Sequence, residues 1–176
     1  MLHEFTQEVE NTAKAVMNEM HTALPGKIIA FSSAQGTVTV KPIGKFVTSD
    51  GKSLEYPKLT DVPLVFPYST LTKTGIAFPI KVGDSCLLIV SEVELDEWRN
   101  GAESEGSLRY DLTNAVAIPG LLRTAGSLIA ESMKENAVVI ASGDTRLYVS
   151  NSGITARGNL TVEGNISYTG SLHGSN

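Results

Sequence analysis

The sequence is poor in the residues that build disulfides, metal centres and nucleic-acid interfaces. It has a single cysteine, Cys86, and three histidines in 176 residues, so an intrachain disulfide cannot form and no zinc-ligand spacing is present. Cys86 lies in an apolar run and is predicted to be a small buried hydrophobe. Fourteen Lys and Arg face nineteen Asp and Glu, which disfavours binding to phosphate backbones, because that affinity depends on clustered cations.

Long apolar runs and enzyme motifs are also missing. No segment approaches the roughly 18 consecutive apolar residues of a membrane span, and the acidic N-terminus lacks the features of a signal peptide, so export by that route is not expected. There is no P-loop and no Gly-x-Ser-x-Gly, and His3, His21 and His173 lie far from any candidate nucleophile. The acidic cluster at 92–97 could hold a carboxylate pair but is better read as a solvated face. We therefore expect no enzyme activity, no catalytic residue, no cofactor and no metal.

Residues 1–25 are predicted to form an amphipathic α-helix. Apolar residues recur there at spacings of three and four, which places them on one stripe, and Pro25-Gly26 is expected to end the helix. A single amphipathic helix must bury its stripe against its own domain or a partner. The residues expected to dock are Phe5, Val9, Val16 and Met20.

Residues 26–120 are predicted to form a small Greek-key barrel of the OB type. Five strand-like runs lie within about 95 residues, at KIIAFSSA, GTVTVKP, DVPLVF, DSCLLIVSE and NAVAIP. The run Thr37–Val40 alternates polar and apolar residues, as a half-buried antiparallel strand does. Gln35-Gly36, Asp50-Gly51 and Gly83-Asp84 are turn signals. Residues 121–136 form a connector to which the sequence assigns no structure.

Residues 137–176 contain a six-residue repeat with few charges. The units are ITARGN, LTVEGN, ISYTGS and LHGSN, and each full unit has apolar first and third residues and a glycine in register. This pattern predicts short strands with one buried face, joined by tight turns that glycine permits. The repeated positions are Ile154, Leu160, Ile166 and Leu172; Ala156, Val162 and Tyr168; and the turn glycines Gly158, Gly164 and Gly170.

Such a segment is not expected to hold its shape alone. Burying two apolar side chains in each unit contributes about 3–6 kcal/mol, whereas ordering the six residues costs about 6–12 kcal/mol of backbone entropy. Without disulfides or metal, oligomerisation is the remaining route to stability. We therefore predict a trimeric β-helical stalk with the column Ile154, Leu160, Ile166 and Leu172 on its axis; a flexible tail is the alternative.

The middle of the chain resembles the central baseplate spike family of contractile-tailed phages, also described as membrane-piercing spike proteins. The resemblance is carried by YPKLTDVPLVFP (56–67), GIAFPIKVGDSCLLIVSE (75–92), DEW (96–98) and RYDLTNAVAIPG (109–120). It implies an N-terminal OB-fold domain and a homotrimer, made in the host cytoplasm and carried in the tail baseplate of the virion. It also implies contact with a tail-tube hub protein, and transiently with the host outer membrane during injection.

The tip and two other functions remain open at this stage. Needles of the family often end in a His-x-His iron site, whereas this chain has only His173, so we expect no metal, and a separate tip protein could cap the stalk. OB barrels also bind single-stranded nucleic acid, but the cations here are too dispersed for us to expect nucleic acid as a partner. A left-handed β-helix acyltransferase is a further alternative, although it needs more coils than this repeat provides.

Overall fold

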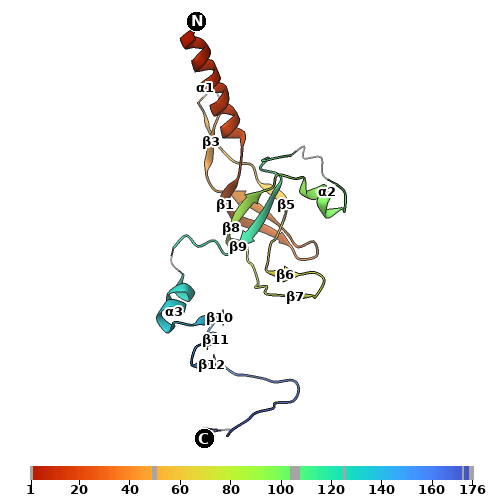
Figure 1. Ribbon diagram of the computed structural model, residues 1–176, viewed down its shortest axis with the longest axis vertical. Coiled ribbons are helices and arrows are strands. Elements are labelled where there is room, and N and C mark those ends of the chain that lie inside the picture. The colour runs from red at the N-terminus through yellow and green to blue at the C-terminus, as the bar shows by residue number, and fades with distance from the viewer. Residues whose placement is uncertain (1, 49–50, 104–107, 125, 172, 175–176) are drawn as a thin grey trace. The chain divides into compact units, whose positions relative to one another are not determined.

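The chain is described by a computed structural model that covers residues 2–48, 51–103, 108–124, 126–171 and 173–174. It divides into two compact units, Met1–Arg123 and Thr124–Asn176. The first unit holds a helix and a five-stranded sheet, and the second holds a short helix and a three-stranded sheet (Figure 1). The protein is therefore mainly β with an N-terminal helix.

The first unit is built on a curled antiparallel sheet. Its strands are β1 (Ala23–Ser32), β2 (Thr37–Pro42), β5 (Leu59–Pro63), β8 (Ser85–Val90) and β9 (Ala115–Pro119), in the order β5-β2-β1-β8-β9. All five strands predicted from the sequence are confirmed. The two edges of the sheet approach each other, because Leu64 forms a parallel bridge with Ala117 and the amide of Val65 donates to the carbonyl of Ala117 at 2.9 Å.

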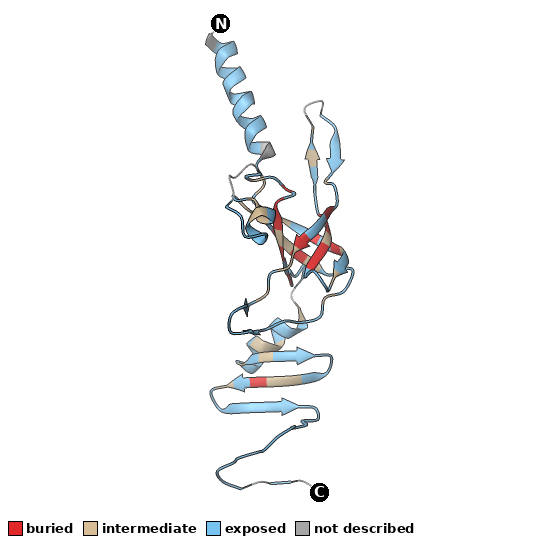
Figure 2. Ribbon diagram, turned by 90° about the vertical axis from the view of Figure 1, so that its right-hand side faces the viewer, coloured by how far each residue is buried: buried red, intermediate tan, exposed pale blue. Residues whose placement is uncertain are grey.

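The core of this unit lies inside the curl of the sheet (Figure 2). Alternation along the strands decides which residues enter it: Cys86, Leu88 and Val90 of β8 are buried, and Ile89 is exposed. Cys86 is a buried small hydrophobe, as predicted, and burial raises the pKa of its thiol to about 11. The largest fully buried side chains are Ile28, Val38, Val40, Val62, Cys86 and Leu88.

Two small hairpins and a short helix, α2 (Leu95–Arg99), are inserted between the main strands. One hairpin pairs β3 (Lys45–Val47) with β4 (Ser53–Glu55), and the other pairs β6 (Tyr68–Ser69) with β7 (Thr74–Gly75). Gly51 has a φ of +79° in the turn of the first hairpin, while Asp50 of the predicted turn signal lies outside the described residues. The turn at residues 50–51 was predicted from the sequence, but the two hairpins were not, because strands of two or three residues carry no periodic signal.

The N-terminal helix is shorter than predicted. It is α1 (Leu2–Glu19), and β1 begins at Ala23, so Pro25-Gly26 does not end the helix. Instead, Pro25 and Gly26 lie opposite Leu87 and Cys86 in the pairing of β1 with β8. Close packing against β2 requires glycine at this position, since a Cβ at residue 26 would lie only 2.4 Å from the side chain of Val40.

A buried asparagine fastens the excursion between β8 and β9. Asn114 is 4% exposed. Its Oδ1 accepts from the amide of Leu95 at 2.9 Å, and its Nδ2 donates to the carbonyl of Val93 at 2.7 Å. The side chain thereby supplies partners to backbone groups that no strand pairs, which buried backbone requires. Asn114 thus holds the start of α2 against the sheet.

Replacing Asn114 with Ala is expected to lower the free energy of unfolding of the first unit by about 2–4 kcal/mol, because buried partners would lose their hydrogen bonds. Denaturant unfolding followed by the fluorescence of Trp98 measures the change. Asn100→Ala is the matched control, the same change at an exposed asparagine. Equal stability of the two variants would contradict the anchoring role of Asn114.

The second unit contains α3 (Ser127–Glu135) and an antiparallel meander of β10 (Val138–Ser142), β11 (Thr145–Ser150) and β12 (Gly153–Arg157). The helix lies in the connector to which the sequence assigned no structure. It ends at Asn136, which adopts the left-handed conformation with φ +46° and ψ +48°. The residues directly upstream of the hexads form the hairpin of β10 and β11.

The hexads do not all form strands in the single chain. The first, from Ile154, lies in β12, but residues 158–171 form no strand. A strand needs a neighbour to receive its backbone hydrogen bonds, and among the described residues these hexads have none within their own chain. The predicted stalk stays a prediction, because it gives the later hexads strand partners from sister chains.

Candidate functional site

The three-stranded sheet of the second unit has two chemically different faces. Val138, Val149 and Ile154 lie opposite one another across the three strands, and so do Ile140, Leu147 and Ala156. Directly paired residues share a face, so these two rows form one surface, which we call the apolar face. The intervening rows, which contain Tyr148, Arg146 and Arg157, point to the other side.

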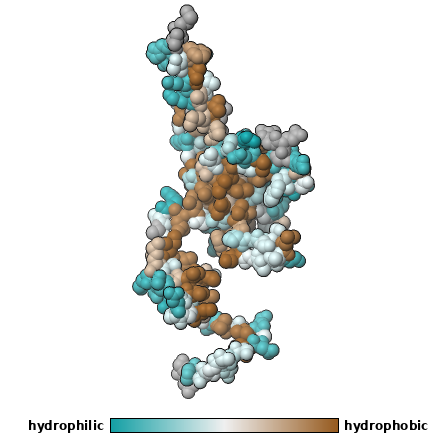
Figure 3. All heavy atoms as spheres, in the orientation of Figure 1, coloured by the Kyte–Doolittle hydropathy of each residue, from teal (hydrophilic) through white to brown (hydrophobic). Residues whose placement is uncertain are grey.

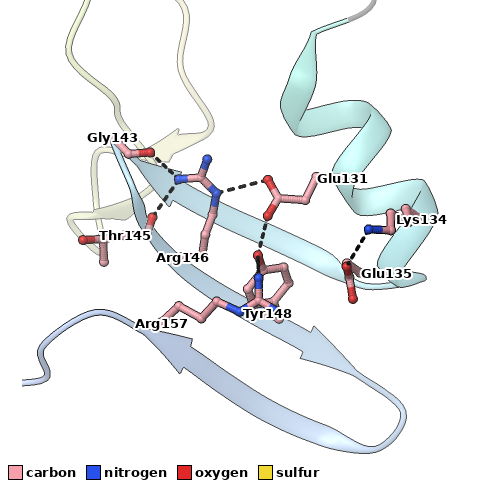
Figure 4. Close-up of polar contacts among 8 residues, drawn as sticks. All are labelled: Glu131, Lys134, Glu135, Gly143, Thr145, Arg146, Tyr148 and Arg157. Atoms are coloured by element: carbon pink, nitrogen blue, oxygen red, sulfur yellow. Dashed lines mark hydrogen bonds and ion pairs between the residues drawn. The ribbon is translucent and has the colours of Figure 1, made fainter.

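The opposite side carries a cluster of four polar residues, the polar clamp: Glu131, Arg146, Tyr148 and Arg157 (Figure 4). Glu131 of α3 accepts from Nε of Arg146 at 3.1 Å and from the hydroxyl of Tyr148. The guanidinium of Arg157 lies 4.8 Å from the centre of the Tyr148 ring. The polar clamp therefore fixes α3 over this side of the sheet and makes Tyr148 the buried residue of its strand.

The polar clamp also shifts two pKa values in opposite directions. The hydrogen bond from Tyr148, followed by the hydrogen bond and charge of Arg146, lowers the pKa of Glu131. The hydrogen bond to Glu131, with desolvation, raises the pKa of Tyr148. The folded state therefore favours an ionised Glu131 and a neutral Tyr148. In these protonation states the Tyr148 hydroxyl donates its hydrogen bond to the Glu131 carboxylate.

These shifts predict a stability window for the second unit. Stability contributed by Glu131 is present above the ordinary carboxyl pKa near 4.3 and is lost as the pH falls through the lowered value. The contribution of Tyr148 is present below about pH 10 and is lost as the pH rises through the raised value. Glu131→Gln is expected to lower the melting temperature at pH 7 and to flatten its fall in acid.

Thermal melts between pH 2 and pH 8 measure this effect. Glu135→Gln is the control, because Glu135 lies on the same helix, is exposed and pairs with Lys134 at 3.9 Å. If both variants keep the wild-type acid profile, Glu131 does not hold α3 on the sheet.

The apolar face is uncovered within its own chain. Val138 is 64% exposed, Ile140 57% and Ile154 70%, and brown atoms gather on this unit in the space-filling view (Figure 3). A groove over the face is lined by Ile140, Leu147, Ala156 and Leu160, among others. A sheet with one side covered and an apolar side exposed is a site for association.

The predicted stalk residues continue from this face. Ile154 is part of it, and the repeated residues that follow within the described ranges are exposed, with Leu160 at 77%. The turn glycines Gly158, Gly164 and Gly170 have φ values of +122°, +143° and +122°, a region that favours glycine. Leu172 lies outside the described residues. The other exposed members are Val162, Ile166 and Tyr168.

The predicted docking stripe lies on α1 except at its end. Phe5, Val9 and Val16 are within the helix and are 68%, 52% and 54% exposed. Met20 follows the last helical residue and is also exposed. The stripe is therefore accessible to a partner.

Sequence reasoning missed the polar clamp and α3. A signal was present, because Arg146 and Arg157 are two of only four charged residues in 137–176, and cations that interrupt an apolar repeat call for an acidic partner. That partner, Glu131, is far away along the chain, so only the fold brings it to Arg146.

The described part of the chain contains neither a helix suited to span a membrane nor a cluster of side chains suited to bind a metal ion. No helix among those residues is long and apolar enough to cross a membrane. No group of three or more His, Cys, Asp or Glu side chains within the described ranges is arranged to hold a metal ion. His173 is exposed.

Together these features define a mainly β protein in which a small curled sheet is followed by a second unit with an uncovered apolar face. The family model described as the phage protein Gp138 N-terminal domain matches residues 24–120, more than half of the chain. The chain therefore belongs to this family of phage proteins. No curated protein matches it significantly.

Proposed function

We propose that this protein is the subunit of a homotrimeric central spike in the baseplate of a contractile phage tail. Its role is structural, without enzyme activity or cofactor: it attaches to the tail hub and pierces the outer envelope of the host when the sheath contracts. The observation that carries the proposal is the apolar face of the second unit, which is followed directly along the chain by a glycine-punctuated apolar repeat.

Sister copies are the occupant that best suits this face. The strand β12 is the edge of its sheet, and an exposed edge beside exposed apolar rows is a template for pairing with another chain. The two apolar rows continue as the repeated columns that start at Ile154 and Ala156. Three copies about one axis would bury both columns and give the later hexads their missing strand partners.

The polar clamp supports the same arrangement. Because Glu131, Arg146 and Tyr148 hold α3 on one side of the sheet, each copy has only its apolar side left to bury. Every copy would therefore turn its apolar face toward the other copies, as a closed assembly about an axis requires. The stalk that results has no open edge and is stiff enough to transmit a thrust.

The first unit supports the family side of the proposal. Its strand order and the parallel bridge between Leu64 and Ala117 give a five-stranded, partly open barrel, from which we infer an OB-type domain. Membership of a phage family and a docking helix at the N-terminus suit a subunit that joins a tail hub in the virion. A separate tip protein would then cap the far end.

The test is the mass of the purified chain in solution. Sedimentation velocity and mass photometry should give three times the 18.7 kDa of one chain at micromolar concentration and below. A clean monomer at these concentrations would rule out the proposed spike. A dimer would also contradict it, because the repeat would then close about a different axis.

A further inference from the structure

The helix α1 has an acidic flank beside its apolar stripe, and this combination specifies the partner that it fits. The helix carries Glu4, Glu8, Glu10 and Glu19 against the single cation Lys14. Glu4 and Glu8 are one turn apart and therefore lie on the same side of the helix. Glu8 shares a surface groove with the stripe residues Phe5 and Val9, so acid borders the apolar surface directly.

The stripe is not used by the chain itself. Every described side chain from His3 to Met17 is exposed, and apolar side chains gather along one side of the helix (Figure 3). A helix of 18 residues is marginal in water without a packing partner. The like charges of Glu4 and Glu8 disfavour it further when it stands alone.

The polar residue at the edge of the stripe, Thr12, already has a hydrogen-bond partner within the helix. The hydroxyl of Thr12, which lines the groove with Phe5 and Val9, donates to the carbonyl of Glu8 at 2.8 Å. It therefore brings no unsatisfied polar group into an interface. Apart from Thr12, the groove is lined by apolar side chains and the carboxylate of Glu8.

Charge decides between the two possible occupants. Three sister helices packed along the stripe would bring their Glu8 carboxylates to the interfaces, with Lys14 on the far side of each helix, and like charges oppose such packing. A separate protein with cations beside an apolar groove would compensate the same charges. An amphipathic helix laid into an apolar groove is a common mode of recognition.

We propose that α1 binds the tail hub protein in an apolar groove flanked by Lys or Arg on the side that meets Glu8. The proposal rests on the spike function proposed above, and it adds the chemistry of the hub surface and the direction in which the helix lies. The hub groove accepts Phe5, Val9 and Val16, and its cations pair with the acidic flank.

Titration of the full-length chain with the purified hub protein of the same tail, in 50 and 500 mM NaCl, tests this. The wild type is expected to bind at least about tenfold more weakly in high salt, because screening weakens exposed charge pairs. Glu8→Lys should lose about tenfold in low salt, and Val9→Asp should abolish binding. The controls are Glu103→Lys, the same charge change away from the helix, and Glu10→Lys, the same change on the side of the helix opposite Glu8; both should bind within about twofold of the wild type.

Several outcomes would overturn the inference. Binding that is independent of salt, or equal effects of Glu8→Lys and Glu103→Lys, would show that the hub groove is not flanked by Lys or Arg. Tighter binding by Glu8→Lys would show an acidic hub surface instead. A trimer that fails to bind the hub at all refutes this inference but leaves the spike, whereas a monomeric wild type refutes the spike itself. Loss of the trimer in Val9→Asp would show that sister helices occupy the stripe.

Discussion

Leu160→Asp is expected to convert the trimer into monomers at micromolar concentration. Within one chain Leu160 is 77% exposed, and a substitution at such a position changes stability by only about 0.5 kcal/mol. In the proposed stalk, three Leu160 side chains meet on a dry axis. Three uncompensated carboxylates there would cost several kcal/mol each, roughly 3–5 kcal/mol per buried charge.

If the protein is a monomer, Leu160→Asp should change its stability little. If it is the proposed trimer, the same substitution should dissociate it, so the variant distinguishes the two states. Sedimentation velocity gives the mass, and thermal melting gives the loss of stability. Thr161→Asp is the matched control, since the period of a strand places residue 161 on the outer side, and its trimer should survive. A Leu160→Asp protein that remains trimeric and melts like the wild type would show that the inward column is assigned to the wrong face.

A chain that ends at Arg123 is expected to keep a folded barrel and to lose the trimer. The core residues of the barrel all lie between Leu24 and Ala117, so its stability does not need the second unit. The apolar face, the polar clamp and the repeat all lie beyond Arg123. Far-UV circular dichroism and a cooperative melt report the barrel, and sedimentation reports the assembly.

A second truncation, after Asn159, separates the contributions of the sheet and the hexads. It keeps β10, β11 and β12 with their apolar face but removes the repeat from Leu160 onwards. We expect a weaker trimer that dissociates on dilution and melts at a lower temperature than the full chain. If the fragment that ends at Arg123 is itself a stable trimer, the barrel drives assembly and the stalk merely follows.

The strands of the curled sheet could be predicted from the sequence because buried and less buried residues alternate along them. In β2, Val38 and Val40 are buried and Thr39 between them is less so, and Cys86, Leu88 and Val90 repeat this in β8. Period-two burial needs no knowledge of distant residues. The small hairpins escaped prediction because their strands are too short to show a period.

The end of α1 was misplaced for a related reason. Ala23 and Leu24 suit the apolar spacing of a helix, and the sequence gives no local sign that they leave it. In the structure they pair with Ile89 and Leu88 of β8, and a strand partner more than 60 residues away outweighs local helix propensity. The docking stripe therefore ends at Val16 within the helix, with Met20 just beyond.

By itself, the sequence determined the mainly β character, the five barrel strands, the amphipathic helix and the repeat, since each depends on residues near one another along the chain. Only the tertiary structure decided which side of the second sheet is covered. That choice rests on Glu131 reaching Arg146 and Tyr148, contacts that span 15 and 17 residues. Pairing across such distances depends on the turns of the whole unit, which local periodicity does not encode.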